Sequence, residues 1–257
     1  MADAFYERLE DDLFRATRWT TGPWGPDAQH AGPPSALLGR AVERLAPDGG
    51  HVARVTADIL RPVPIADLRV DAAVVKPGRS VQLAEARLAA ADEPVMIARA
   101  WTIRTASLDL PAPAPAPAPP LPADEGTLMF EDRSETDYLA AMQWSFVDGS
   151  FFEPGPATAW LRMRFPLVEG EAPSPLQRVL TAADSASGIS GALDFARWVY
   201  VNPDLTVYLH RPLDGEWVCL DAATTAEPSG VGLTTSVIHD RRGPLGRTGQ
   251  SLFVAPR

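Results

Sequence analysis

The stretch SPLQRVLTAADSASGIS, residues 174–190, decides how the rest of this 257-residue chain is arranged. Ser174 can cap a helix at its start, and Gln177 stands where a capping box places the reciprocal partner. Apolar residues then recur at helical spacing, at Leu176, Val179, Leu180 and Ala183. We therefore predict one long helix over about 175–188, ended by Gly188, with its apolar face against a core.

One acidic residue, Asp184, falls on or beside that apolar face, because it follows Leu180 by four residues. Burying an unpaired carboxylate there would cost several kcal/mol, so we expect it to have hydrogen-bond partners. These residues alone leave two roles open for Asp184. It is either a structural acid satisfied by its neighbours or an acid that works on a ligand.

The chain repeats one order of elements twice: extended segments with aromatic residues, a long helix, and four strands. In the first half we predict a helix over about 34–46 and strands over about 52–60, 68–75, 80–89 and 95–104. In the second half we predict strands over about 205–211, 216–225, 231–239 and 247–254. The pair Arg61-Pro62 recurs as Arg211-Pro212, an offset of 150 residues, which favours a duplicated domain.

Residues 111–122 are Pro-Ala repeats, which form neither helix nor sheet and should run as an extended linker. We therefore divide the chain into an N-terminal domain (1–108), a linker (109–126) and a C-terminal domain (127–257).

The composition argues against several classes of partner and cofactor. A net charge of −10 disfavours binding to nucleic acid. Cys219 is the only cysteine and the four histidines lack zinc-ligand spacing, so we expect no disulfide within the chain, no metal ion and no other cofactor. Because no apolar run reaches about 18 residues, we expect no integral membrane segment and a soluble, cytoplasmic protein.

A helix packed across a curved antiparallel sheet, twice in one chain, is the plan of a double hotdog, an α+β fold. The sequence resembles the acyl-CoA thioesterase II and thioesterase-like superfamily in LTAADS (180–185), NPDLTVYLHRP (202–212) and GRTGQSL (246–252). The resemblance extends over nearly the whole chain apart from the linker. We expect the two sheets to pair edge to edge into one long sheet, because this pairing removes two exposed edges.

The resemblance implies hydrolysis of a fatty acyl thioester, carried by CoA or by a carrier protein, by a water held by an Asp, a Thr or Ser, and a Gln. By position these are Asp184, Asn202 and Gln250, and Asn202 departs from the hydroxyl of the family pattern. Strand parity agrees for Gln250, which should face the same side as Leu252 and Val254. The first half lacks these residues, so we expect one active site per chain.

We expect the first half to supply backbone N–H groups at the start of its helix, near Gly32 and Ser35, which can stabilise an oxyanion. Pro33 and Pro34 remove two such donors, and His30 is a further candidate for lining the site. Gly32, Ser35 and His30 are therefore the predicted oxyanion or substrate-binding residues.

Three functions stay open, and acyl-CoA thioesterase is preferred. The second is a non-catalytic protein that binds acyl-CoA or a fatty-acyl group. The third is an enoyl-CoA hydratase, which usually needs an Asp–His pair on the helix, and no histidine follows Asp184 before His210. Homo-oligomers also stay open, because two hotdogs in one chain already make the contact that single hotdogs make by dimerising.

Overall fold

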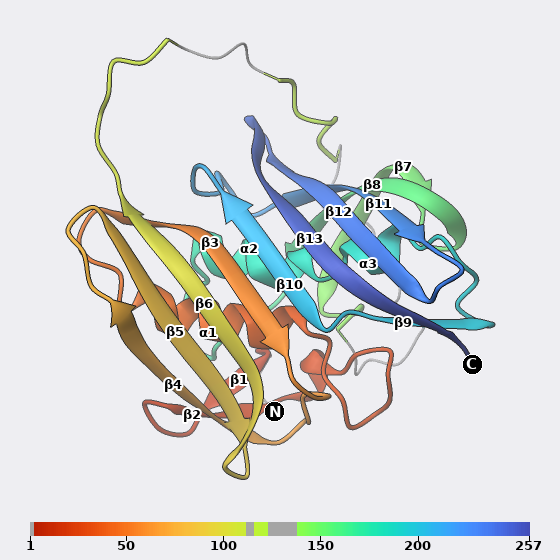
Figure 1. Cartoon of the computed structure of the whole chain (residues 1–257), viewed down its shortest axis with the longest axis horizontal. Helices are drawn as coiled ribbons and strands as arrows, with labels where there is room; N and C mark the ends of the chain where they lie inside the picture. The colour runs from red at the N-terminus through yellow and green to blue at the C-terminus, as the bar shows by residue number, and fades with distance from the viewer. Residues whose placement is uncertain (1–2, 112–115, 123–137) are drawn as a thin grey trace.

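The described residues fold around one sheet of 13 strands, all paired antiparallel (Figure 1). This computed structural model describes residues 3–111, 116–122 and 138–257. The strands of the first half are β1 (Tyr6–Arg8), β2 (Leu13–Ala16), β3 (Gly50–Ile59), β4 (Asp67–Lys76), β5 (Val81–Ala90) and β6 (Glu93–Arg104). Those of the second half are β7 (Met142–Ser150), β8 (Glu153–Met163), β9 (Trp198–Val201), β10 (Asp204–Leu209), β11 (Val218–Ala226), β12 (Val231–Asp240) and β13 (Gly243–Pro256).

The eight strands predicted from sequence correspond to β3–β6 and β10–β13, with ends that shift by a few residues. The strand order is β1-β2-β4-β5-β6-β3-β10-β13-β12-β11-β8-β7, and β9 adds to β13 beside this path. Alternation explains how the sheet buries one face. In β5, for example, the buried residues are Gln82, Ala84, Ala86 and Leu88, and the residues between them are more exposed.

The two halves of the sheet join where β3 pairs with β10. Thr56 lies opposite Thr206, 150 residues further along the chain, and their hydroxyl oxygens are 3.2 Å apart. One position along, Val55 faces Val207. Thr56 and Thr206, which are separated by the repeat offset, therefore meet at this seam, and the pairs on either side follow as they would about a two-fold axis. The predicted edge-to-edge pairing into one sheet is confirmed.

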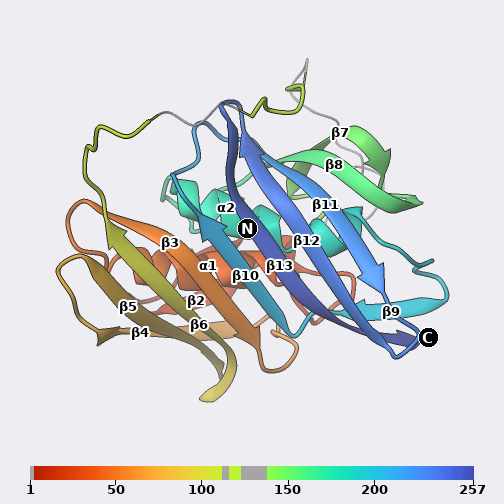
Figure 2. The same cartoon turned by 45° about the horizontal axis from the view of Figure 1, so that its top comes forward.

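In the part of the chain that the structure describes, three α-helices lie together on one face of the sheet (Figures 1 and 2). They are α1 (Gly32–Glu43), α2 (Pro175–Ala183) and α3 (Ala186–Ile189), and a 3₁₀ turn, η1, spans Arg18–Thr20. The core lies between these helices and the sheet, and its largest fully buried side chains include Trp144, Trp160, Tyr6, Tyr138, Phe5 and Phe14. Helix α1 touches α2 closely, because a Cβ added to Gly32 would lie 2.2 Å from the Thr181 carbonyl oxygen.

The prediction of one long helix over 175–188 is wrong, because α2 has nine residues and α3 four. At the break, the Ser185 N–H donates to the Ala182 oxygen, three residues back rather than four. Serine and glycine, which have low helix propensity, follow at once, and this weakens the helix there. Gly188 lies inside α3, which ends at Ile189.

The start of α2 also differs in part from the capping box. Ser174 Oγ does accept from the Gln177 N–H over 3.1 Å, as predicted. The Gln177 side chain, however, donates to Glu43 of α1 over 3.4 Å, and Ser174 Oγ donates to the same Glu43 carboxylate over 2.6 Å. The cap therefore ties α2 to α1 instead of closing on itself. In the first half, α1 begins two residues before the predicted position and ends at Glu43, so Pro33 and Pro34 occupy its first turn.

Residues 116–122 of the predicted linker carry no helix or strand, and the Pro120 oxygen accepts a hydrogen bond from Trp160 Nε1 over 2.8 Å. Residues 112–115 and 123–126 of that linker lie outside the described residues, and the boundaries at 108 and 127 stay predictions. Among the described helices, none combines the length and apolar character needed to span a membrane.

The close approach of α1 and α2 gives a first prediction. Gly32→Ala should lower the free energy of unfolding by about 1–3 kcal/mol, because the new Cβ meets a backbone carbonyl that cannot turn away. Denaturant unfolding followed by circular dichroism measures this. The matched control is Gly249→Ala, where nothing lies within 4 Å of the added Cβ. Equal stability of the two variants would show that the helices can separate at no cost.

Candidate active site

Asp184 is the residue directly after α2, and its side chain is only 6% exposed. Two amides hold one of its oxygens. Asn202 Nδ2 donates to Oδ1 over 2.8 Å, and Gln250 Nε2 donates to the same oxygen over 3.0 Å. The structure therefore brings together the three residues that the resemblance implies. Their burial as a bonded group meets the requirement that a buried carboxylate be paired.

The local sequence explains why Asn202 and Gln250 point inward. Asn202 lies between β9 and β10, where Pro203 interrupts the strand, and its Nδ2 also donates to the Asp204 oxygen over 3.2 Å. Gln250 is fully buried in β13, on the same side as Leu252 and Val254, as its parity predicted.

The other carboxylate oxygen of Asp184 faces the first half of the chain. His30, in the loop before α1, places Nδ1 3.2 Å from Asp184 Oδ2. The Gly32 N–H points at the same nitrogen from 3.1 Å. If Nδ1 carries the ring proton, it can donate to Asp184 but cannot accept from Gly32. If the proton is on Nε2, Nδ1 can accept from Gly32 but cannot donate to Asp184, so the tautomer decides which hydrogen bond forms. Burial lowers the pKa of His30, and the nearby Asp184 carboxylate opposes this shift.

Two residues beside this group were missed by sequence reasoning. The Tyr138 ring stacks on His30, with ring centroids 3.7 Å apart and an interplanar angle of 6°. Its hydroxyl donates to the Thr181 oxygen over 2.8 Å and lies 2.8 Å from Ser185 Oγ. Ser185 could have been noticed, since it follows Asp184 and lies one turn after Thr181. Tyr138 carries no comparable signal, because the residues of the site that it contacts, His30, Thr181 and Ser185, are distant from it in sequence.

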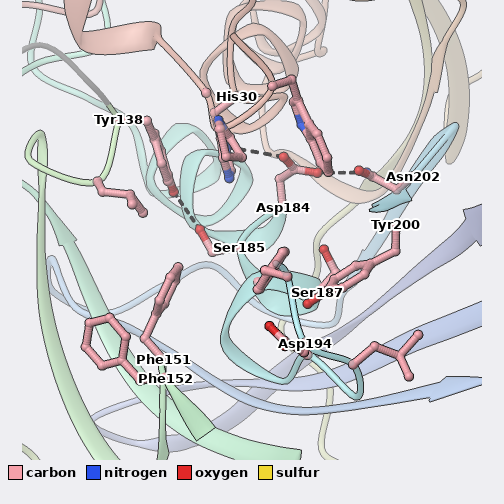
Figure 3. A pocket seen from close by; sticks show the side chains of 18 of the residues that line it. His30, Tyr138, Phe151, Phe152, Asp184, Ser185, Ser187, Asp194, Tyr200 and Asn202 are labelled. Atoms are coloured by element: carbon pink, nitrogen blue, oxygen red, sulfur yellow. Dashed lines mark hydrogen bonds and ion pairs between the residues drawn. The ribbon is translucent and has the colours of Figure 1, made fainter. Parts of the chain in front are cut away.

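Asp184, Asn202 and His30 line a cavity of about 710 Å³ (Figure 3). Its wall is rich in apolar and aromatic side chains, including Trp24, Leu139, Trp144, Phe151, Phe152, Leu193 and Phe195. Gln250 does not line the cavity and holds Asp184 from behind. A mostly apolar cavity with a few converging polar groups is the usual form of a small-molecule site.

Comparison with known families decides what kind of protein this is. Residues 20–103 match the acyl-CoA thioesterase N-terminal domain, and residues 111–254 match the acyl-CoA thioesterase C-terminal domain. The chain belongs to the acyl-CoA thioesterase family. Membership supports thioester hydrolysis as its activity. No curated protein matches the sequence closely enough to add a relative.

Solved structures show that this thioesterase family member has the hotdog fold. A conserved protein of unknown function with a hot dog fold from Alicyclobacillus acidocaldarius superposes with a TM-score of 0.75, at 15% identity over 96% of this chain and 95% of that one. The acyl-CoA thioesterase II TesB2 from Mycobacterium marinum gives 0.68, at 16% identity over 99% and 96%. The TesB protein from Mycobacterium avium subs paratuberculosis gives 0.66, at 16% identity over 98% and 96%.

Gly32 and Ser35, the predicted oxyanion donors of this thioesterase family member, do not line the cavity as His30 does. Ser35 is fully buried, and its N–H donates to the Ala31 oxygen over 3.0 Å. The Gly32 N–H points at His30 Nδ1, and neither residue lines the cavity. The Ser35 N–H therefore already has an acceptor, and the Gly32 N–H has one only in the tautomer whose Nδ1 carries no proton. Within the described ranges, no three His, Cys, Asp or Glu side chains are grouped so that they could hold a metal ion.

The lowered pKa of His30 gives a prediction about stability and pH. The unfolded chain takes up a proton near pH 6.5 while the folded chain resists it, so this residue destabilises the fold as the pH falls below about 6.5. His30→Gln should therefore lose less unfolding free energy than the parent between about pH 7.5 and about pH 5.5. Denaturant unfolding at both pH values measures this. The remaining histidines are present in both proteins, so their effect cancels in the comparison. An equal loss of unfolding free energy in the variant and the parent would show that His30 takes up a proton equally well in the folded and the unfolded chain.

Proposed function

We propose that the protein hydrolyses a fatty acyl-CoA to the free acid and CoA by direct attack of water. The observation that carries this proposal is the Asp184 carboxylate, buried at the wall of an apolar cavity with one oxygen held by two amides. The held oxygen fixes the plane of the carboxylate. Its Oδ2 is not held by the amides and faces His30 Nδ1 at 3.2 Å, so it can take part in the proton transfer that activation of a water requires.

The reaction needs no intermediate in which the acyl group is bonded to the protein. The water oxygen bonds to the thioester carbon, and Asp184 orients that water or removes its proton. The tetrahedral intermediate then collapses, the carbon–sulfur bond breaks, and the proton taken from the water returns to the departing sulfur. Atoms and charges balance without any further reactant.

Asn202 can replace the hydroxyl of the family pattern in this scheme. Its Nδ2 already donates to Asp184 and to the Asp204 oxygen, which leaves its Oδ1 to accept a hydrogen bond from the water. Gln250 acts at one remove, because its Nε2 donates to Asp184 while the residue lies outside the cavity wall. We therefore assign it the task of positioning the carboxylate.

The cavity supports an acyl group as the part of the substrate that enters. Its aromatic wall offers apolar surface to a hydrocarbon chain, and a volume of about 710 Å³ lies within the range of small-molecule sites. CoA and a carrier protein present the same thioester, so the carrier is an outcome of the assays below.

A specific contact keeps enoyl-CoA hydratase as a second candidate. The Asp–His pair that was absent from the helix is formed instead between Asp184 and His30, whose atoms are 3.2 Å apart. Such a pair could add water across a carbon–carbon double bond, with the hydroxyl going to the β-carbon and a proton to the α-carbon. The third candidate, binding of an acyl-CoA without turnover, rests on the departure at Asn202.

The central test replaces the acid by its amide. In Asp184→Asn the retained oxygen can still accept from Asn202 and Gln250, and the new NH₂ group can face His30, so the shape of the site is kept. Cleavage of dodecanoyl-CoA should fall on the order of 10²–10⁴-fold, the usual contribution of a positioned acid or base. Single-turnover release of thiol measures cleavage, and calorimetry should find dodecanoyl-CoA binding largely retained.

The matched control for this test is Asp71→Asn, which changes an exposed aspartate of β4 in the same way. It should cleave at the parental rate. Equal rates for Asp184→Asn and the parent would remove Asp184 from the mechanism. Tight binding without cleavage by any of the three proteins would favour the acyl-binding candidate.

One substrate separates hydrolysis from hydration. With trans-2-decenoyl-CoA, we expect the parent protein to release free thiol and 2-decenoic acid, because the proposed water attacks the thioester carbon. Thiol release and the absorbance of the conjugated double bond can be followed in the same sample. Loss of that absorbance without thiol release would make the hydratase reading correct.

A further inference from the structure

The cavity has a second group that can move a proton, the ring of His30. Its Nδ1 is 3.2 Å from Asp184 Oδ2, while its Nε2 makes no hydrogen bond within the described part of the chain. Within the described residues, Nε2 has no partner and is not fully buried, so it is open to the cavity that His30 lines. Nδ1 thus faces the carboxylate (Figure 3), and Nε2 is left to the cavity that the ring lines.

The proton on the ring has a preferred place. On Nδ1 it gives a hydrogen bond from a neutral donor to an ionised carboxylate, whereas on Nε2 it leaves Nδ1 to accept from the neutral Gly32 N–H. A charge-assisted hydrogen bond is roughly twice as strong as a neutral one. The carboxylate therefore selects the tautomer whose lone pair lies on Nε2, the side open to the cavity.

The surroundings of His30 also suit a base. Tyr138 stacks flat on the ring at 3.7 Å and fixes its plane. Among the described residues, Asp184 and Tyr138 are the titratable groups that face the ring from neighbouring elements. Burial raises the pKa of Tyr138, so Tyr138 stays neutral. Burial lowers the pKa of His30, which keeps its ring neutral and able to accept a proton near pH 7.

We propose that His30 is a catalytic residue of this site, and that its Nε2 exchanges the proton of the attacking water while Asp184 orients it through Nδ1. The proposal rests on the proposed hydrolase function and deepens it. A proton leaves the water for Nε2 as the oxygen bonds to the thioester carbon, and Asp184 stabilises the imidazolium that forms. When the carbon–sulfur bond breaks, Nε2 returns this proton to the sulfur. Carboxylate, imidazole and reacting oxygen in this order are known to work on unrelated folds.

The first test compares kinetics of the full-length protein on dodecanoyl-CoA. His30→Gln should lower kcat on the order of 10²–10⁴-fold with a much smaller change in KM, because the glutamine cannot titrate. The acid limb of the parental pH–rate profile should disappear in this variant. The control His210→Gln, an exposed histidine outside the cavity, should keep both the parental kcat and the parental profile. A kcat for His30→Gln within about threefold of the parent would overturn the proposal.

Chemical rescue separates a base from a structural residue. His30→Ala leaves a gap open to the cavity, and added imidazole should raise its kcat at least about tenfold. Asp184→Asn keeps its histidine and should gain nothing from imidazole. Thermal denaturation identifies folded protein for each assay, and folded His30→Ala that shows no rescue counts against the proposal.

A measurement without turnover distinguishes failure of this inference from failure of the proposed function. Nitrogen NMR of the histidine rings should find the His30 proton on Nδ1 in the parent and on Nε2 in Asp184→Asn. The proton on Nε2 in the parent would overturn the dyad even if the protein cleaves thioesters. If the parent cleaves no thioester, the proposed function fails, and the tautomers still decide whether Asp184 orients His30.

Discussion

The buried carboxylate of Asp184 constrains much of this structure. A charge at 6% exposure is tolerated only where donors reach it, and here they come from separate parts of the chain. Asn202 arrives from the junction of β9 and β10, Gln250 from β13, and His30 from the loop before α1. Each of these segments must be in place for the acid to be satisfied. The same contacts that meet the cost of burial also orient the acid toward the cavity.

The packing of the two halves makes that meeting geometrically stable. The β3–β10 seam aligns the halves of the sheet, and α1 lies against α2 with only a glycine hydrogen between Gly32 and the Thr181 carbonyl. Glu43 of α1 accepts from both Ser174 and Gln177 at the start of α2, so the two helices are also joined by polar contacts. A shift between the halves would move His30 relative to Asp184. Position in the fold, rather than local sequence, therefore sets the distance between these two groups.

Much of the fold could be predicted from the sequence because its signals are periodic. Alternation located the strands and the inward side of Gln250, and the 150-residue offset indicated the duplication from which the edge-to-edge pairing of the two sheets was expected. The break after α2 was missed because Asp184 and Ser185 keep helical dihedral angles while only their hydrogen bonds change. The pairing of His30 with Asp184 was missed for a different reason. The two residues are far apart in the chain, and no spacing rule connects a loop of one half with a helix of the other.

The seam between β3 and β10 has a consequence for how the protein behaves on dilution. Two hotdogs on separate chains would separate when their concentration fell below their dissociation constant, and a site shared between them would be lost. Here the polypeptide itself keeps the halves at a high effective concentration, whatever the amount of protein in the cell. Covalent linkage also frees each half to change alone. A substitution in a symmetric dimer appears twice, whereas here a histidine could be kept in one half and an acid in the other, each in a single copy.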